Sequence, residues 1–187
     1  MHGVALLLSV LAMLTPFEKG GKWGYKDTAG KVVIPPRYQV AQEFSPEGIA
    51  AVVDQKGWAY IDARGSILIR PLVVDNGPDY FAENLARFAS DGKVGFFDRH
   101  GKVAIDPVHE FAMPFSEGRA AVCRGCSPTQ QGEHRVVQGG LWGFIDRRGA
   151  LVIPLQFEEA ASFDGGSARV RLGGRWRRID REGKILR

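Results

Sequence analysis

The chain has 187 residues, of which 44% are apolar and 24 are glycine, a composition that excludes a disordered chain and suits a β protein rich in turns. The formal net charge is +4, but the segment from Asp164 onward holds eight Lys or Arg against three Asp or Glu. The preceding part is close to neutral, so the basic character belongs to the C-terminal segment alone.

The N-terminal segment, residues 1–16, is apolar from Gly3 to Thr15. This run is shorter than the roughly 20 residues of a membrane-spanning helix, so no transmembrane anchor is expected. One interpretation is a signal-peptide core, although the segment lacks Lys, Arg, a small-x-small cleavage pattern and a lipobox cysteine. The other is a β-strand left from a preceding repeat, because Gly3-Val-Ala-Leu resembles Gly118-Arg-Ala-Ala. We slightly favour export to the periplasm or cell envelope over a cytoplasmic location.

Residues 17–187 repeat a pattern in which Gly follows Asp by three residues. The steps between successive copies are 35, 36, 48 and 34 residues, and the five copies start at Asp27, Asp62, Asp98, Asp146 and Asp180. An Asp that opens a tight turn can accept a hydrogen bond from the backbone N–H two residues on, and Gly supplies the positive φ that closes the turn. Each copy is therefore predicted to link two strands in a hairpin.

Strand signals flank each turn. The position four residues before the Asp is occupied by Trp23, Trp58, Val94, Trp142 and Trp176. An apolar run such as Val32-Val33-Ile34-Pro35 follows the turn, and Pro marks the end of a strand because it cannot donate to a ladder. A third strand is expected after further turns at Gly48, Asn84, Gly118 and Gly166. Because the tryptophans share one repeat position, they are predicted to be core residues rather than a sugar-stacking platform.

These patterns predict an all-β fold of tandem repeats, each a short antiparallel unit of three strands, with the last of five copies incomplete. The units could stack linearly as a solenoid or close as a propeller-like ring. Closure would need the stretch from Gly3 to Leu8 to supply a strand to the last sheet.

The copies resemble the WG-containing β-repeat family, also called KWG repeats, which is widespread in bacterial proteins. The resemblance covers Gly21 to Arg187 and rests on Gly21-Lys22-Trp23-Gly24-Tyr25 and Leu141-Trp142-Gly143-Phe144-Ile145-Asp146. The sequence departs from the pattern at Val94, at Ala59 and at Arg177-Arg178. The resemblance implies an all-β binding or scaffold module, and it implies no catalytic residue.

An insert at 123–138 precedes the fourth hairpin and is predicted to be a loop on one face of the array. It contains Cys123 and Cys126, which could form a local disulfide, remain a reduced or redox-active thiol pair, or supply half of a metal site. A metal site would need His134 with His109 or His100, because no second cysteine pair exists. We expect a disulfide if the protein is exported, and no metal.

The last copy carries the candidate partner-binding residues Arg169, Arg171, Arg175 and Arg177. Arg169 and Arg171 alternate with apolar residues, so a strand would place both on its solvent face as a cationic stripe. A terminal repeat that replaces apolar residues by charged ones would give the same pattern.

The sequence favours a non-catalytic scaffold that binds a protein or polymeric partner, at the cell envelope, through the insert and the arginines. The alternative is binding of an anionic polymer, either nucleic acid or acidic lipid, through the Arg-rich last copy, with nucleic acid the weaker expectation. No enzyme, metal or cofactor is expected, because each recurring Asp has a turn-forming role and no His stands in a recognisable triad motif.

Overall fold

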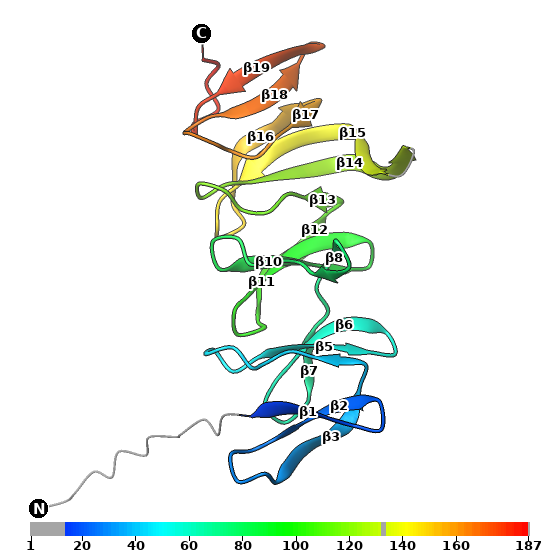
Figure 1. Ribbon diagram of the computed structural model, residues 1–187. Coiled ribbons are helices and arrows are strands. Elements are labelled where there is room, and N and C mark those ends of the chain that lie inside the picture. The colour runs from blue at the N-terminus through cyan, green and yellow to red at the C-terminus, as the bar shows by residue number, and fades with distance from the viewer. Residues whose placement is uncertain (1–13, 132–133, 187) are drawn as a thin grey trace, which may run out of the picture. The chain divides into compact units, whose positions relative to one another are not determined.

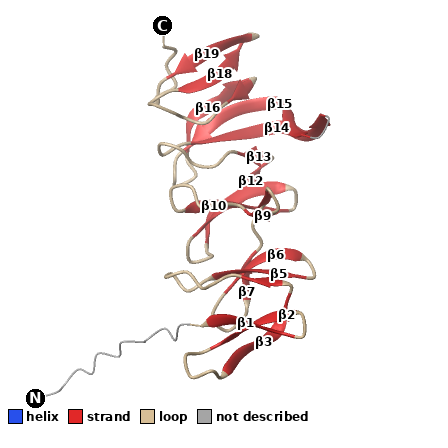
Figure 2. Cartoon of the chain, viewed as in Figure 1, coloured by secondary structure: helices blue, strands red, loops and turns tan. Residues whose placement is uncertain are grey.

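The structure is a computed structural model that describes residues 14–131 and 134–186. Every regular element in these ranges is a β-strand (Figure 2), and the strands form six antiparallel sheets of two to four strands, which confirms the all-β repeat prediction. The chain divides into two compact units, Met1–Leu68 and Ile69–Arg187. The predicted signal core or strand at Gly3 to Leu8 lies outside the described residues.

The first unit holds two sheets that pack on one core. Its strands are β1 (Thr15–Lys19), β2 (Lys22–Lys26), β3 (Val32–Tyr38), β4 (Val40–Ala41), β5 (Ala50–Asp54), β6 (Gly57–Ile61) and β7 (Ile67–Ile69), whose last residue begins the second unit. Tyr25 and Ile34 of the first sheet share a buried cluster with Val52 and Ile61 of the second. The core therefore lies between successive sheets, as expected for repeats that cannot bury an apolar face alone.

The second unit contains three larger sheets and a short hairpin (Figure 1). Its strands are β8 (Val73–Val74), β9 (Gly77–Pro78), β10 (Leu85–Ser90), β11 (Lys93–Asp98), β12 (Val103–His109), β13 (Phe111–Ala112), β14 (Ala120–Gln131), β15 (His134–Ile145), β16 (Leu151–Phe157), β17 (Glu159–Ala160), β18 (Ala168–Leu172) and β19 (Arg175–Ile179). Two buried clusters fill the spaces between its sheets, one around Phe96 and Ile145 and one around Phe144 and Ile179.

Four of the sheets join two consecutive copies of the sequence repeat; the exceptions are β1-β2-β3 and the short β8–β9 hairpin. The third strand of one copy, such as β10, pairs with the Trp-position strand of the next copy, here β11, which then pairs with β12. The same order recurs in β14-β15-β16 and in β5-β6-β7. Successive copies therefore share backbone hydrogen bonds as well as side-chain contacts.

The predicted Asp-Gly turns are confirmed in all five copies. In the fourth, the Asp146 Oδ1 atom accepts hydrogen bonds from the N–H groups of Arg148 (2.9 Å) and Ala150 (3.0 Å), and Gly149 has a φ of 82°. Equivalent pairs of bonds form at the other four aspartates, namely Asp27, Asp62, Asp98 and Asp180. The turn glycine also contacts the preceding copy, since a Cβ at Gly149 would lie 3.0 Å from the Ile105 side chain.

The core prediction for the tryptophans is wrong for Trp176 and only partly right for Trp23 and Trp58. Trp142 is 4% exposed, because Phe157 lies opposite it across the ladder and the Phe111 ring packs edge-on at 5.8 Å. Trp176 is 47% exposed. Strand β18 pairs with one edge of β19, and among the described residues no strand pairs with Trp176 on the other edge. A neighbouring strand alone does not bury this position, since Trp23 lies opposite Tyr38 and is only partly buried, so burial also depends on packing such as that of the Phe111 ring.

Candidate functional site

The insert forms the long β14–β15 hairpin, which corrects the prediction of a loop. The same register holds from Ala120 opposite Ile145 to Gln131 opposite His134, with an interruption at Gly125 and Gly140. Figure 1 shows this hairpin extending beyond the ends of the neighbouring strands. The inserted residues continue an existing antiparallel ladder, so their backbone groups remain paired instead of forming a separate loop.

A bend in this hairpin is built from glycines. Gly125, Gly139 and Gly140 all have positive φ values, between 70° and 75°. A Cβ atom at Gly140 would lie 2.5 Å from the Arg124 carbonyl oxygen, so only glycine fits there. These φ values interrupt the extended backbone of both strands at this point.

The two cysteines lie beside this bend. Cys123 and Cys126 are buried, with their Cα atoms 6.1 Å apart and their sulfur atoms paired. This separation lies within the usual range for a disulfide, so the geometry is compatible with the predicted cross-link. Among the predicted histidine partners, His100 lies in the Asp98 turn and His109 ends β12, while the side chain of His134 lies outside the described part.

A groove of about 550 Å³ runs between β15 and the following repeat. Its lining consists of Val137, Gln138, Gly139 and Gly140 on one side and Glu158, Glu159 and Arg171 on the other. The two glutamates lie at the junction of β16 and β17, which sequence reasoning did not single out. Their adjacency to Arg171 follows from the β17–β18 register, in which Glu159 lies opposite Arg171.

The candidate arginines lie on two faces of the β18–β19 hairpin. Arg169 and Arg171 share one face, as the alternation predicted, because Arg169 lies opposite Arg178 and Arg171 lies opposite Trp176. Arg177 lies opposite Val170 and Arg175 opposite Leu172, which places them on the other face. The four candidates therefore do not form one continuous patch on a single face.

Arg169 and Arg171, on the shared face, both have local partners. The Arg171 guanidinium bonds to Glu159 at 2.7 Å and lies 3.3 Å from Glu158. The Arg169 guanidinium lies over the Trp176 ring, 4.9 Å from its centre. Local acidic and aromatic groups thus reduce the positive potential that this face presents to a partner.

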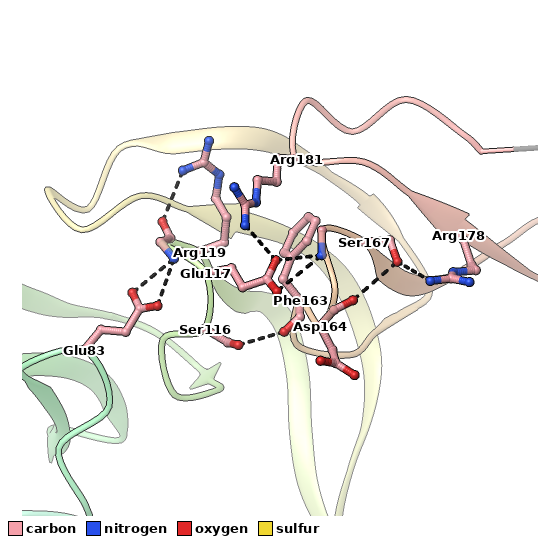
Figure 3. Close-up of polar contacts among 11 residues, drawn as sticks. Glu83, Ser116, Glu117, Arg119, Phe163, Asp164, Ser167, Arg178 and Arg181 are labelled. Atoms are coloured by element: carbon pink, nitrogen blue, oxygen red, sulfur yellow. Dashed lines mark hydrogen bonds and ion pairs between the residues drawn. The ribbon is translucent and has the colours of Figure 1, made fainter.

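Glutamates clamp successive repeats together in the second unit (Figure 3). Glu117 accepts hydrogen bonds from the Gly166 N–H, at 2.9 Å, and from the Arg181 guanidinium, at 2.9 Å. Glu83 binds the Gly118 N–H and the Arg147 guanidinium in the same way, and both Glu-to-Arg spacings are 64 residues. The missed sequence signal was a Glu directly before the turn into the third strand, at Glu83 and Glu117, with an Arg 64 residues later, directly after a turn Asp, at Arg147 and Arg181.

One buried ion pair supports the irregular second copy. The Asp79 carboxylate accepts hydrogen bonds from the Arg87 side chain at 2.8 and 2.9 Å and from its backbone N–H at 2.9 Å. Arg87 also donates to the Ala112 carbonyl oxygen, so both charged groups are fully engaged in holding β9, β10 and β13. This pair has a structural role.

Comparison with known families identifies the repeat. A model for the WG containing repeat matches residues 23–57, 95–125 and 142–176, together more than half of the chain. The chain belongs to the WG-repeat family. The matches leave out the segment from Trp58 to Val94, which holds Ala59 and the irregular turn at Asn84.

The WG repeat takes its name from a dipeptide whose glycine has a steric role here. A Cβ at Gly143 would lie 2.5 Å from the Ile153 carbonyl oxygen, where the β15–β16 register shifts.

Comparison with curated proteins found no match. Within the described residues, no helix is long and apolar enough to cross a membrane, and no group of three or more His, Cys, Asp or Glu is placed to hold a metal ion.

Proposed function

We propose that this WG-repeat protein is a non-catalytic scaffold that holds a protein or polymeric partner along its repeats, at the cell envelope. The supporting observation is one half-exposed aliphatic side chain at the same position in every copy. These residues, the aliphatic ridge, lie two positions after each turn glycine and are between 46% and 50% exposed: Val32, Ile67, Val103, Leu151 and Ile185.

The ridge argues for binding because strand formation alone does not require it. Thr has a β propensity similar to that of Val and Ile and would satisfy a half-exposed strand position without presenting apolar surface. Exposed apolar surface that recurs from copy to copy within a unit suits an interaction site. The recurring aspartates support a non-catalytic role, since each one bonds to the backbone of its own turn.

The proposal is tested by replacing the ridge within the second unit. The triple variant Val103→Thr, Leu151→Thr, Ile185→Thr should no longer retain the partner that the wild-type chain captures from extracts of the native host. A matched triple variant at exposed apolar positions outside the ridge, Val73→Thr, Val108→Thr, Leu172→Thr, should retain it. Equal capture by both variants, or no specific capture by the wild type, would contradict the proposal.

The alternative partner is an anionic polymer bound by the Arg-rich last repeat. The division of Arg169 and Arg171 from Arg175 and Arg177, and the two glutamates beside Arg171, argue against it. Retention on heparin that falls steeply between low and moderate salt would favour this alternative instead.

A further inference from the structure

The three ridge residues of the second unit occupy equivalent ladder positions. Leu151 lies opposite Ile145 and Ile185 lies opposite Ile179, and both partners are buried residues directly before a turn Asp. Val103 has the same arrangement in the third copy. Residues directly opposite each other in a ladder share one face of the sheet. Each ridge side chain is therefore the half-exposed margin of a buried apolar layer.

Contacts between successive copies set the spacing of these margins. The turn glycine of one copy packs on the isoleucine that follows the ridge residue of the preceding copy by two positions. A Cβ atom at Gly149 would lie 3.0 Å from the Ile105 side chain, and one at Gly183 would lie 3.0 Å from the Ile153 side chain. Since stacked sheets lie about 10 Å apart, a partner lying along the second unit meets one aliphatic side chain about every 10 Å.

An exposed cation lies close to each of these ridge residues in the sequence. Lys102 and Lys184 directly precede ridge residues, and both are exposed. Neither lysine forms an ion pair with any residue that the structure describes. In the fourth copy Arg148 takes this place, and its side chain is 87% exposed while it contacts Asp146 at 3.2 Å.

The turn aspartates are recessed and already occupied. Asp98, Asp146 and Asp180 are partly buried, and the Oδ1 atom of each accepts two backbone N–H groups. The exposed charged residues of these turns are one acid, Glu182, and five bases: Lys102, Arg147, Arg148, Arg181 and Lys184. The clamp glutamates bind two of the bases, Arg147 and Arg181, which leaves three cations for one acid. The ridge of the second unit is therefore bordered by positive charge.

We infer that this ridge binds a protein segment that presents carboxylate and aliphatic side chains next to each other, at intervals of about 10 Å. The aliphatic groups pack on Val103, Leu151 and Ile185, and the carboxylates pair with Lys102 and Lys184. This assignment rests on the proposed function and specifies the chemistry of its partner. The apolar contacts provide affinity, and the lysines provide the preference for an acidic segment.

Two other anionic partners fit the ridge less well. Nucleic acid offers phosphates to the lysines but no aliphatic side chains to cover the ridge. A lipid bilayer takes up apolar side chains that protrude into its acyl region. The ridge side chains lie on strands and are half covered by the protein, so a protein segment that packs against them is the better match.

The test uses a random-peptide library displayed on phage and selected on the full chain. We expect enriched peptides to combine Asp or Glu with Leu, Ile or Val. A synthetic copy of an enriched peptide should bind the double variant Lys102→Gln, Lys184→Gln about tenfold more weakly than wild type in fluorescence polarisation. The matched double variant Lys22→Gln, Lys56→Gln removes two exposed lysines of the first unit that lie outside the ridge, and it should bind normally.

Charge reversal gives a second readout that loss of folding cannot imitate. The variant Lys102→Glu, Lys184→Glu should bind a peptide whose acidic residues are replaced by Lys more tightly than it binds the original peptide. The ridge variant Val103→Thr, Leu151→Thr, Ile185→Thr should bind neither peptide. Enriched peptides without acidic residues, unchanged affinity in the Gln variant, no reversal, full binding by the ridge variant, or no enrichment would overturn the assignment.

Two further outcomes separate this assignment from its alternatives. Sedimentation with phosphatidylglycerol vesicles that requires Lys102 and Lys184, without peptide binding, would assign the lysines to lipid and overturn it. Capture of the host partner by the Lys102→Gln, Lys184→Gln variant as by wild type, together with loss of capture in the ridge variant, would refute the acidic chemistry and leave the proposed function supported. Capture by both variants would refute the two together.

Discussion

Glycine occupies the position after the tryptophan position in three of these repeats because a register shift against the neighbouring strand leaves no room for a side chain. At Gly24, Gly95 and Gly143 a Cβ atom would collide with the carbonyl oxygen of the isoleucine on the adjacent strand. Each of these glycines faces a seven-residue strand, whereas Ala59 is tolerated beside β7, which has three residues. The glycine is therefore required where the adjacent strand continues past it.

Substitution of one such glycine should destabilise the protein. Gly143→Ala places a methyl group 2.5 Å from a backbone oxygen, so we expect it to lower the free energy of unfolding by about 1–3 kcal/mol. Urea denaturation measures the change. Gly77→Ala serves as the control, since a Cβ there would have its nearest contact at 3.7 Å, and an equal loss in the two variants would contradict the steric explanation.

The Asp79–Arg87 pair allows a second residue-scale prediction. Asp79 is 1% exposed, so Asp79→Ala leaves the Arg87 guanidinium buried without its counter-charge and should cost about 3–5 kcal/mol. The double variant Asp79→Ala, Arg87→Ala should lose less free energy of unfolding than the two single variants lose together. Simple additivity in urea denaturation would mean that the two side chains do not act as a pair.

Successive hairpins are held together by the glutamate clamps. The hydrogen bond from Arg181 holds the pKa of Glu117 below its ordinary value of 4.5, against the opposing effect of burial and with further help from the Gly166 N–H. The lowered pKa means that the folded state favours the ionised form. The resulting stabilisation is complete above pH 4.5 and is lost as the pH falls through the lowered pKa.

The clamp predicts a pH-dependent difference between two variants. Glu117→Ala should have a lower melting temperature than wild type at neutral pH, and this gap should narrow as the pH is lowered below 4.5. Glu182→Ala, at an exposed turn position, should have nearly the melting temperature of the wild type both at neutral pH and below pH 4.5. A gap for Glu117→Ala that stays constant with pH would show that lost packing, and not charge, is responsible.

The cysteine pair is tested at the element scale as well. A disulfide between Cys123 and Cys126 would close a short loop in β14, and its removal by Cys123→Ser with Cys126→Ser should cost about 2 kcal/mol. Iodoacetamide treatment of denatured, unreduced protein from the native host should leave both cysteines unlabelled. Two labels per chain would show that the thiols are free in the cell.

At the scale of the whole molecule, none of the described core clusters crosses the boundary between Leu68 and Ile69. One cluster lies between Leu14 and Ile61, and the two others lie between Leu85 and Ile179. We therefore expect a fragment of residues 69–187 to fold independently, with a β-type circular dichroism spectrum and a cooperative thermal transition. A fragment without a transition would show that the second unit requires the first.

The sequence determined the features that form within a few residues. Each turn Asp bonds to N–H groups two and four positions away, and the turn Gly adopts positive φ, so five hairpins could be predicted from spacing alone. The all-β fold followed from the same periodic signals, and the family followed from the resemblance of the segments around Trp23 and Trp142 to the WG repeat. These features are local, since their hydrogen bonds join atoms that are close in the chain under any packing.

Only the tertiary structure decided which distant groups meet. How far the tryptophan position is buried depends on the groups packed against it: Phe157 of β16 and the Phe111 ring cover Trp142, whereas Trp176 pairs with Arg171 of β18 and, among the described residues, with no strand on the other edge of β19. The groove lining depends on the register that places Glu159 opposite Arg171. Register and bending arise from pairing and packing between residues that are far apart in the sequence. The spacing of residue types within one short segment therefore does not predict them.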